Sequence, residues 1–232
     1  MTSPFSLSLG WRVEWNRVRV KPREVILPPE IRPLMYAVAS IGVIGSVQIK
    51  QLFGLEDRKE LKQLCKDHFL MRHQLVGKKA IPIYTLGTNM IHHFQLPPNY
   101  WLHWRPEDVL KRMVFFKLYE VFRDYEPEIV PSPDPFVGAM LIGQKLYHVF
   151  VARDDVYDLV LNKKWNKNPE QRIIVVAEKL EYLSPSNPFL ADFKVRATTD
   201  EDLTRENGID QMFYEWDEAN IVWIKHESIY KK

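Results

Sequence analysis

Apolar positions between residues 46 and 69 recur at the spacing of two short helices, and from residue 70 to residue 86 they alternate with polar positions. The first predicted helix carries Ile49, Leu52 and Phe53 on one side. The apolar side of the second comprises Leu61, Leu64, Cys65 and His68 or Phe69. Residues 70–76 and 80–86 are strand-like, with Gly77-Lys78-Lys79 as the turn between them. The pattern therefore predicts two helices followed by a β-hairpin.

Polar residues mark the ends of these helices. Ser46 is a favourable N-cap for the first, and Gly54 stands where a glycine commonly ends a helix. Asp57 caps the second helix, with Glu60 at the N3 position of a capping-box-like pair. Upstream, Pro28, Pro29 and Pro33 lead into another helix over residues 33–41. Three helices and a hairpin in this order predict a winged helix-turn-helix over residues 28–95.

Basic residues gather on the outer side of the second helix and on the hairpin. Residues 57–79 hold seven Lys or Arg and three acids, a balance of +4, whereas the whole chain carries only +2. Residues 178–220, by contrast, have a balance of −7. This segregation of charge suits phosphate contacts. The candidate DNA-binding residues are Arg58, Lys59, Lys62, Gln63, Lys66, Arg72, Lys78 and Lys79.

Within this set the side chains suit different targets. Arg58 and Gln63 have the donor geometry to recognise base edges in the major groove. Lys62, Lys66, Lys78 and Lys79 are better suited to phosphates. An outer helix face that is charged is also what solvation alone produces, and lysine-rich turns are common. The argument for DNA therefore depends on the helix order and the basic hairpin together.

Residues 1–27 form an N-terminal arm whose alternation predicts a strand over residues 11–20. The strand carries Arg12, Arg17 and Arg19. It is either an extra edge strand or a source of further contacts to DNA or to another subunit. After a short helix from Thr88 to Phe94, residues 96–125 connect the two halves of the chain. They contain an aromatic stretch with Tyr100, Trp101 and Trp104.

Pro106 then opens a helix to about residue 125 that is apolar nearly all round. Such a helix is buried, either as a support between domains or at a dimer interface. Residues 126–232 have an α/β pattern, with strands over 136–142, 146–152, 173–177, 193–197 and 221–224 and helices over 154–161 and from 180 to the prolines after 183. The expected fold class is α+β, a winged helix-turn-helix followed by a small α/β domain with a mixed sheet, joined by the long buried helix.

The composition narrows the chemistry. A single cysteine excludes an internal disulfide framework and a cysteine-based zinc site within one chain, and nine glycines argue against a glycine-rich nucleotide fold. Cys65 lies on an apolar helix face, where a small buried hydrophobe is expected rather than a nucleophile. We expect no bound cofactor and no metal. Without a secretory signal or an apolar run of spanning length, the protein is expected to be cytoplasmic and not bound to membranes.

Three local motifs give the chain a resemblance to a known family. The wing ends in IYTLGTNM, Pro133-Asp134 precedes the hairpin VGAMLIGQKLYHVFVARDD, and the strand IIVVA is followed by FKVRATTDEDL. Over roughly residues 30–205 this organisation resembles the replication-relaxation family of plasmid and mobile-element proteins. The resemblance implies a winged helix followed by a restriction-endonuclease-like α/β domain. It also implies a DNA-binding role in plasmid replication, maintenance, transfer or gene regulation.

Residues that would make the second half an active nuclease are only partly present. Such a nuclease needs two acids to hold Mg²⁺ and a lysine to help activate water. Asp134 is available as the first acid, although its proline neighbours are typical of a turn. Where Glu-x-Lys is expected, the chain has Val151-Ala152-Arg153. Asp154 and Asp155 follow at the strand end, where a metal site would need a shifted geometry.

Three hypotheses for function result. The first is a non-enzymatic protein that binds double-stranded DNA as a homodimer. Its α/β half would be a scaffold, a dimerisation surface or a docking site for another replication or segregation protein. The second is a Mg²⁺-dependent nuclease that uses Asp134 with Asp154 or Asp155. The third is a protein-interaction module in which the aromatic segment 100–122 binds a partner and the winged helix is a docking surface.

Overall fold

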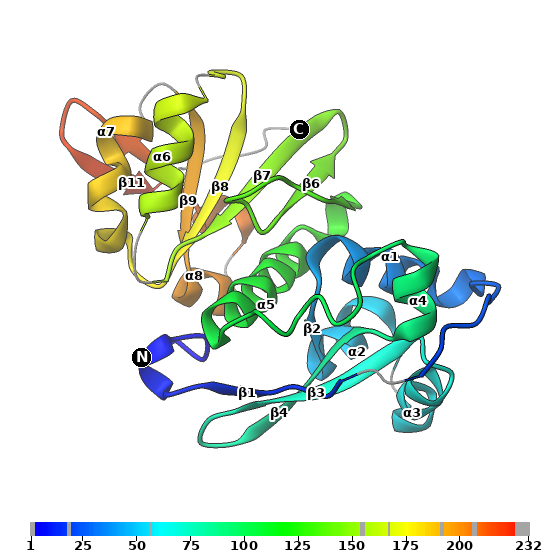
Figure 1. Cartoon of the computed structure of the whole chain (residues 1–232). Helices are drawn as coiled ribbons and strands as arrows, with labels where there is room; N and C mark the ends of the chain where they lie inside the picture. Colours follow the sequence, from blue (N-terminus) through cyan, green and yellow to red (C-terminus); the bar gives the residue numbers. More distant parts are fainter. Residues whose placement is uncertain are drawn as a thin grey trace. The chain divides into compact units, whose positions relative to one another are not determined.

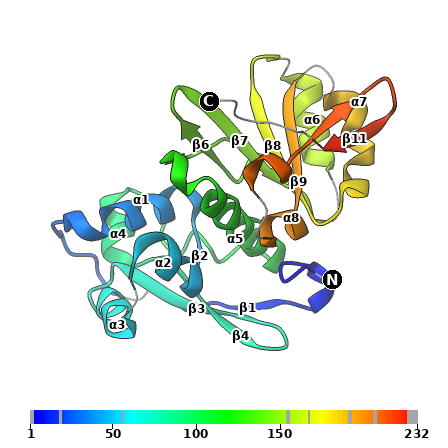
Figure 2. The same cartoon turned by 180° about the vertical axis from the view of Figure 1, so that it is seen from behind.

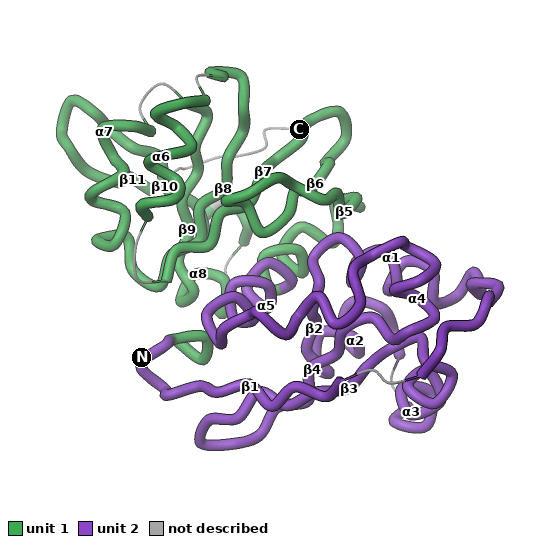
Figure 3. The backbone as a smooth tube through the Cα atoms, viewed as in Figure 1, with its two compact units in different colours: residues 1–6, 117–232 green, residues 7–116 purple. Residues whose placement is uncertain are grey.

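The computed structural model describes residues 3–17, 20–55, 57–153, 156–166, 168–190, 193–205 and 208–225. Over these residues the chain is an α+β protein with eight α-helices, a four-stranded antiparallel sheet and a seven-stranded mixed sheet (Figure 1). The expected fold class is confirmed at this level. The chain divides into an N-terminal unit, residues 7–116, and a C-terminal unit, residues 1–6 with 117–232 (Figure 3).

The N-terminal unit contains a helix–strand–helix–helix–hairpin succession preceded by an arm and followed by two more helices. Its elements are η1 (Leu7–Leu9), β1 (Arg12–Glu14), η2 (Pro29–Ile31), α1 (Arg32–Ile41), β2 (Ile44–Gly45), α2 (Ser46–Phe53), α3 (Arg58–Lys66), β3 (Leu70–Val76), β4 (Ala80–Leu86), α4 (Thr88–His93) and the first part of α5 (Pro106–Val121). The boundary between the units falls inside α5.

The sheet of this unit has the order β1-β3-β4-β2, and all its pairings are antiparallel. The predicted hairpin strands over 70–76 and 80–86 are confirmed. The predicted strand over residues 11–20 is too long, because β1 pairs with β3 only from Arg12 to Glu14, and Arg19 lies outside the described residues. The two-residue strand β2 was not predicted, since two residues are too few to show alternation.

The helix ends follow the predictions with one correction. Gly54 ends α2 with φ 67°, in the left-handed region that glycine adopts at little cost. Ser46, however, is the first helical residue rather than the N-cap, and Gly45 takes the cap position. The Gly45 N–H donates to Gln48 Oε1 at 3.0 Å, and Gln48 Nε2 donates to the Met113 carbonyl at 2.6 Å. The buried Gln48 side chain thus accepts the N–H of the N-cap residue and joins α2 to α5.

His73 lies at the centre of the N-terminal unit and is fully buried. The backbone N–H of Asn16 donates to His73 Nδ1 at 2.9 Å, so the ring proton resides on Nε2, which lies 2.8 Å from Thr85 Oγ1. Trp15 packs edge-on against the imidazole, with ring centroids 4.9 Å apart. Burial lowers the pKa of His73 to about 3. The neutral ring therefore connects the arm to both strands of the hairpin.

The aromatic stretch after α4 is part of the same core. Trp101 is fully buried, lies 5.0 Å from the His73 ring and donates its indole N–H to the Asn16 carbonyl at 3.2 Å. Tyr100 donates its hydroxyl to the Gly42 carbonyl at 2.8 Å. A Cβ on Gly42 would lie 2.2 Å from the Trp104 ring, so a glycine is required there.

The C-terminal unit is built on a seven-stranded sheet of order β11-β10-β9-β8-β7-β6-β5. Strands β7, β8 and β9 run parallel and the other pairings are antiparallel. Its elements are the end of α5, η3 (Arg123–Tyr125), β5 (Glu128–Val130), β6 (Gly138–Ile142), β7 (Lys145–Val151), α6 (Tyr157–Trp165), β8 (Arg172–Ala177), η4 (Leu180–Ser186), α7 (Asn187–Leu190), β9 (Lys194–Thr199), α8 (Asp200–Thr204), η5 (Ile209–Gln211), β10 (Tyr214–Asp217) and β11 (Val222–Lys225).

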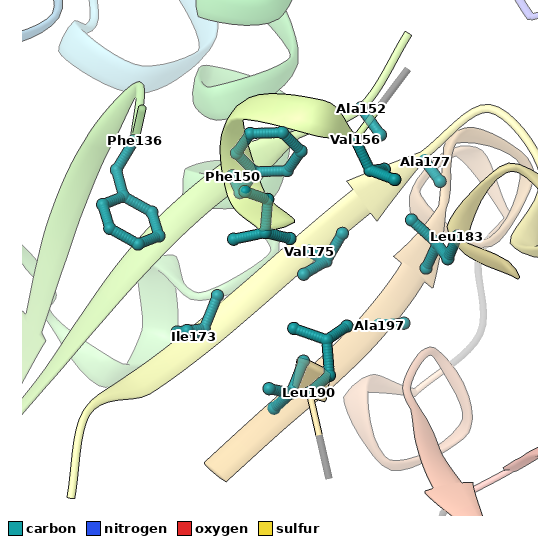
Figure 4. Close-up of a cluster of buried hydrophobic side chains, with 12 residues drawn as sticks. Phe136, Phe150, Ala152, Val156, Ile173, Val175, Ala177, Leu183, Leu190 and Ala197 are labelled. Carbon is teal, nitrogen blue, oxygen red and sulfur yellow. The ribbon is translucent and has the colours of Figure 1, made fainter. Parts of the chain in front are cut away.

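One face of this sheet forms an apolar core with the helices that connect the parallel strands. Helices α6 and α7 lie beside β8 and β9 (Figure 2). Phe150, Ile173, Val175 and Ala197 are part of one buried cluster with side chains of the α6, η4 and α7 layer (Figure 4). Leu159, Leu183 and Leu190 close the cluster from the helical side. Val, Ile and Ala on adjacent parallel strands are typical of a sheet covered by crossover helices.

The predicted strands of this half are present with small shifts of their ends. Strands β5 and β10 were not predicted, because each is short and its residues alternate weakly between apolar and polar. The segment after residue 180 was expected to stop at the prolines. It instead continues as η4 through Pro185 and leads directly into α7.

The His73 arrangement predicts that acid destabilises the protein. The folded-state pKa lies below the value of about 6.5 in the unfolded chain, so the unfolded state binds the extra proton and stability falls as pH drops below 6.5 toward 3. Between pH 7.5 and pH 5 we expect this residue to account for a loss of about 2 kcal/mol in the free energy of unfolding.

Urea denaturation at the two pH values, followed by tryptophan fluorescence, measures that loss. His73→Gln is expected to be less stable at pH 7.5 but to lose distinctly less than the wild type on acidification. His103→Gln, which changes an exposed histidine of the same unit, is the matched control and should keep the wild-type pH dependence. Equal pH dependence in all three proteins would contradict the assignment.

Candidate nucleic-acid interface

Helix α3 presents most of its surface to solvent. Leu64 is its one buried residue, and Leu61 and Cys65 are half-buried beside it. The Asp57 carboxylate accepts the Lys59 N–H at 2.8 Å, as the sequence predicts for an N-cap. At the other end His68 adopts φ 57°, and the Phe69 N–H returns to the Leu64 carbonyl at 2.9 Å. The helix is therefore fixed at both ends while its outer face stays open.

The basic candidates are all on accessible surface. Arg58, Lys59, Lys62 and Lys66 are exposed on α3, and none of them forms an ion pair with another residue of the described ranges. Arg72 is exposed on β3, opposite Tyr84 in the pairing with β4. Because these cations form no ion pair with a described residue, they are available to phosphate oxygens.

Gln63 differs from its neighbours. Its side-chain amide donates to both carboxylate oxygens of Asp67, at 2.9 and 2.8 Å. The predicted contact of Gln63 with a base edge therefore requires this exposed hydrogen-bonded pair to open. Arg58 at the first turn needs no such change.

The hairpin carries the second group of basic residues. Lys78 and Lys79 are exposed at its tip, and Figures 1 and 2 show α3 and the tip at opposite ends of β3 and β4. Seven residues of strand separate the two groups by roughly 20 Å. Trp11 packs against the tip so closely that a Cβ on Gly77 would lie 2.8 Å from its ring. The arm thus supports the hairpin as an edge strand.

Asp134, the first candidate acid for a nuclease, lies in a turn before β6. It is exposed, and the Phe136 N–H donates to the Pro133 carbonyl at 3.1 Å across it. Asp154 and Asp155 lie outside the described residues. Within the described ranges no group of three or more His, Cys, Asp or Glu is arranged to hold a metal ion.

Arg153 stands where a nuclease would carry its lysine, and its surroundings give it a structural role. Its side chain is fully buried at the end of β7 and its guanidinium lies 3.1 Å from the Asp200 carboxylate, which also accepts from Ser3. Burial raises the pKa of Asp200, and the positive charge of Arg153 opposes that rise. Asp200, the first residue of α8, is thus one half of a buried ion pair.

Other reactive groups take ordinary structural positions. Cys65 is half-buried, and burial raises the pKa of its thiol, which disfavours the nucleophilic thiolate. His92 and His93 are exposed at the end of α4. Among the described residues no helix combines the length and the apolar character that crossing a bilayer requires.

Comparisons with protein families, with curated proteins and with solved structures found no match to this chain. The case for function therefore depends on the exposed basic residues of α3 and the hairpin and on the element order that positions them.

The buried ion pair yields a test of the role of Arg153. Arg153→Met leaves the Asp200 carboxylate buried without its partner and is expected to lower the free energy of unfolding by about 3–5 kcal/mol. Replacing both residues, as Arg153→Met with Asp200→Leu, should recover most of that loss, since neither charge then remains. Thermal or urea denaturation measures both effects.

The exposed ion pair between Arg205 and Glu201 provides the control. Arg205→Met should cost no more than about 0.5 kcal/mol. A loss of that small size for Arg153→Met as well would show that the guanidinium is dispensable for folding and would reopen a functional role.

Proposed function

We propose that the N-terminal unit is a winged helix-turn-helix that binds double-stranded DNA. In this proposal α3 enters the major groove and the β3–β4 hairpin contacts the neighbouring phosphate backbone. The observation that carries the proposal is the exposed basic face of α3, fixed at both helix ends and free of ion pairs with described residues.

The connectivity of the unit supports this assignment. The succession α1–β2–α2–α3–β3–β4 places three helices before the hairpin, and the short strand β2 pairs with β4 at the edge of the small sheet. Such an arrangement supports α3 from behind with the hairpin and leaves its outer face to a ligand. Gln48 accepts from the Gly45 N–H and donates to the Met113 carbonyl, so it joins α2, the helix before α3, to α5.

Side chains at the first turns of α3 are those that contact bases in this docking mode. Arg58 is suited to guanine, while Lys62 and Lys66 are suited to phosphates along the groove. Lys78 and Lys79, about 20 Å away, would reach the backbone on the far side of that groove. A twofold dimer would place two such helices about one helical turn apart on one side of the DNA.

The resemblance to the replication-relaxation family extends the proposal to biology. It favours a plasmid or mobile-element protein that acts without catalysis in replication, maintenance, transfer or transcription regulation. The C-terminal unit then serves as a scaffold, a dimerisation surface or a docking site for another replication or segregation protein. The burial of Trp101 in the N-terminal core makes the aromatic segment a poor candidate for a partner site, which favours the DNA hypothesis over the protein-interaction hypothesis.

The role of α3 can be tested by charge reversal. Lys62→Glu with Lys66→Glu is expected to reduce affinity for a labelled duplex at least about tenfold and to lower the slope of log K against log salt by about 1.8, because two phosphate contacts are lost. Fluorescence anisotropy across a salt series measures both quantities, and circular dichroism checks the fold.

Lys164→Glu with Lys179→Glu makes the same change of charge on exposed lysines of the C-terminal unit and is the matched control. It should leave the salt slope unchanged. Wild-type binding in the α3 variant, or an equal loss in the control, would remove α3 from the interface.

The hairpin contributes a separate prediction. Lys78→Gln with Lys79→Gln should weaken binding to all duplex sequences to a similar extent and lower the salt slope by up to about 1.8, because backbone contacts do not distinguish sequences. Competition between a preferred and a random duplex checks this, and the ratio of the two affinities is expected to stay constant. A changed ratio would indicate that the hairpin meets base edges.

A further inference from the structure

A hollow of about 400 Å³ lies in the C-terminal unit where the parallel strands β7, β8 and β9 begin. Its size is within the range of small-ligand sites. Six of its lining residues, all on these strands or on β10, concern the argument: Lys145, Tyr147, Arg172, Lys194, Arg196 and Glu215. None of them belongs to the basic surface of α3 and the hairpin.

The strand register brings these residues to one side of the sheet. Tyr147 pairs with Arg172 and Arg172 pairs with Lys194, so the three form a row across neighbouring strands. Because side chains alternate along a strand, Lys145 lies on the same face as Tyr147, and Arg196 on the same face as Lys194. The opposite face, with Ile173 and Val195, is part of the apolar core. Val195 and Leu190 of that core also line the hollow, which therefore lies at the edge where the strands begin. Adjacent strands are about 4.8 Å apart, so the row spans roughly 10 Å.

Positive charge exceeds negative charge in the hollow. Arg196 pairs with Glu215, and Lys194 pairs with Glu170 at the rim. Lys145 and Arg172 form no ion pair with a residue of the described ranges. The hydrogen bond from Lys194 and the charges of Lys194 and Arg172 lower the pKa of Glu170, so this carboxylate lies near both cations. The cations Lys145, Arg172, Lys194 and Arg196 still outnumber the carboxylates Glu170 and Glu215. The excess positive charge is available to an anionic ligand.

We infer that this hollow binds single-stranded DNA, with phosphates on Lys145 and Arg172 and a base stacked on Tyr147. A positively charged groove combined with an aromatic platform is how proteins hold single strands without sequence preference. The arginine fork suits a phosphate, and the tyrosine face accepts any base. The row runs across three strands rather than into a closed cavity, which suits a chain that passes through more than an isolated nucleotide.

This inference is independent of duplex binding by α3. If the N-terminal unit engages a duplex while the C-terminal unit holds an unpaired strand, the protein would favour DNA in which both forms occur together. If one of the two binding proposals is wrong, the other can still be tested.

Anisotropy of a fluorescein-labelled oligodeoxythymidine of about twelve nucleotides, measured with the full chain, tests the inference. Tyr147→Leu is expected to lower affinity about tenfold, whereas Tyr147→Phe, which keeps the ring, should restore it. Lys145→Gln with Arg172→Gln should lower the salt slope by about 0.7 for each lost phosphate contact. Circular dichroism checks that each variant is folded, and the phenylalanine variant remains informative if the leucine variant is not.

Lys62→Glu with Lys66→Glu is the control, because it should weaken binding to the duplex and leave the affinity for the single strand unchanged. ADP provides a second arm that separates a free nucleotide from a strand. Oligodeoxythymidine binding that depends on Tyr147 and the two cations, and that millimolar ADP does not displace, supports the inference. Binding unaffected by these variants, binding lost only in the α3 variant, or ADP binding at these residues without strand binding would overturn it.

Discussion

The neutral imidazole of His73 is the contact on which the N-terminal unit depends. One ring nitrogen accepts from the backbone of Asn16 and the other lies against Thr85, so a single side chain joins the arm to the two strands of the hairpin. Trp15 and Trp101 cover the ring and keep it from water. If Nδ1 were protonated, its N–H would face the N–H of Asn16, and neither could accept a hydrogen bond. Burial and this hydrogen bond therefore both favour the neutral imidazole. The contact thus joins the arm to β3, the strand that follows α3 in the chain, and to β4.

The basic residues of α3, unlike His73, lie outside the core. α3 buries only Leu64, and its cations form no ion pair with a described residue. In the C-terminal unit, by contrast, the buried Arg153 is compensated by the buried Asp200. A buried pair of this kind is expensive to break but adds little net stability. Position 153 is where an active nuclease of this class would have its lysine. The buried ion pair with Asp200 gives a structural reason for an arginine there.

Local patterns in the sequence were sufficient for the elements that are long or strongly periodic. The hairpin strands, α1, α3 and the turn at Gly54 follow from alternation, helical spacing and glycine chemistry, and so do the exposed positions of the basic residues on α3. The Ser46 cap was wrong because Gln48, a side chain within the helix, satisfies the preceding N–H. The short strands β2, β5 and β10 depend on pairing with distant segments, and their own residues carry too little periodicity to identify them.

The residues of the hollow could not be predicted as a group from the sequence pattern. Tyr147, Arg172 and Lys194 are spread over forty-eight positions of the chain, and each is unremarkable beside its neighbours. Only the register of β7, β8 and β9 makes them adjacent. The basic face of α3 is local and was predictable, because helical spacing alone gathers its lysines. The residues of a site that spans parallel strands become neighbours only once the crossover connections fix the strand order. Such a site can therefore be recognised from the structure but not from the sequence pattern.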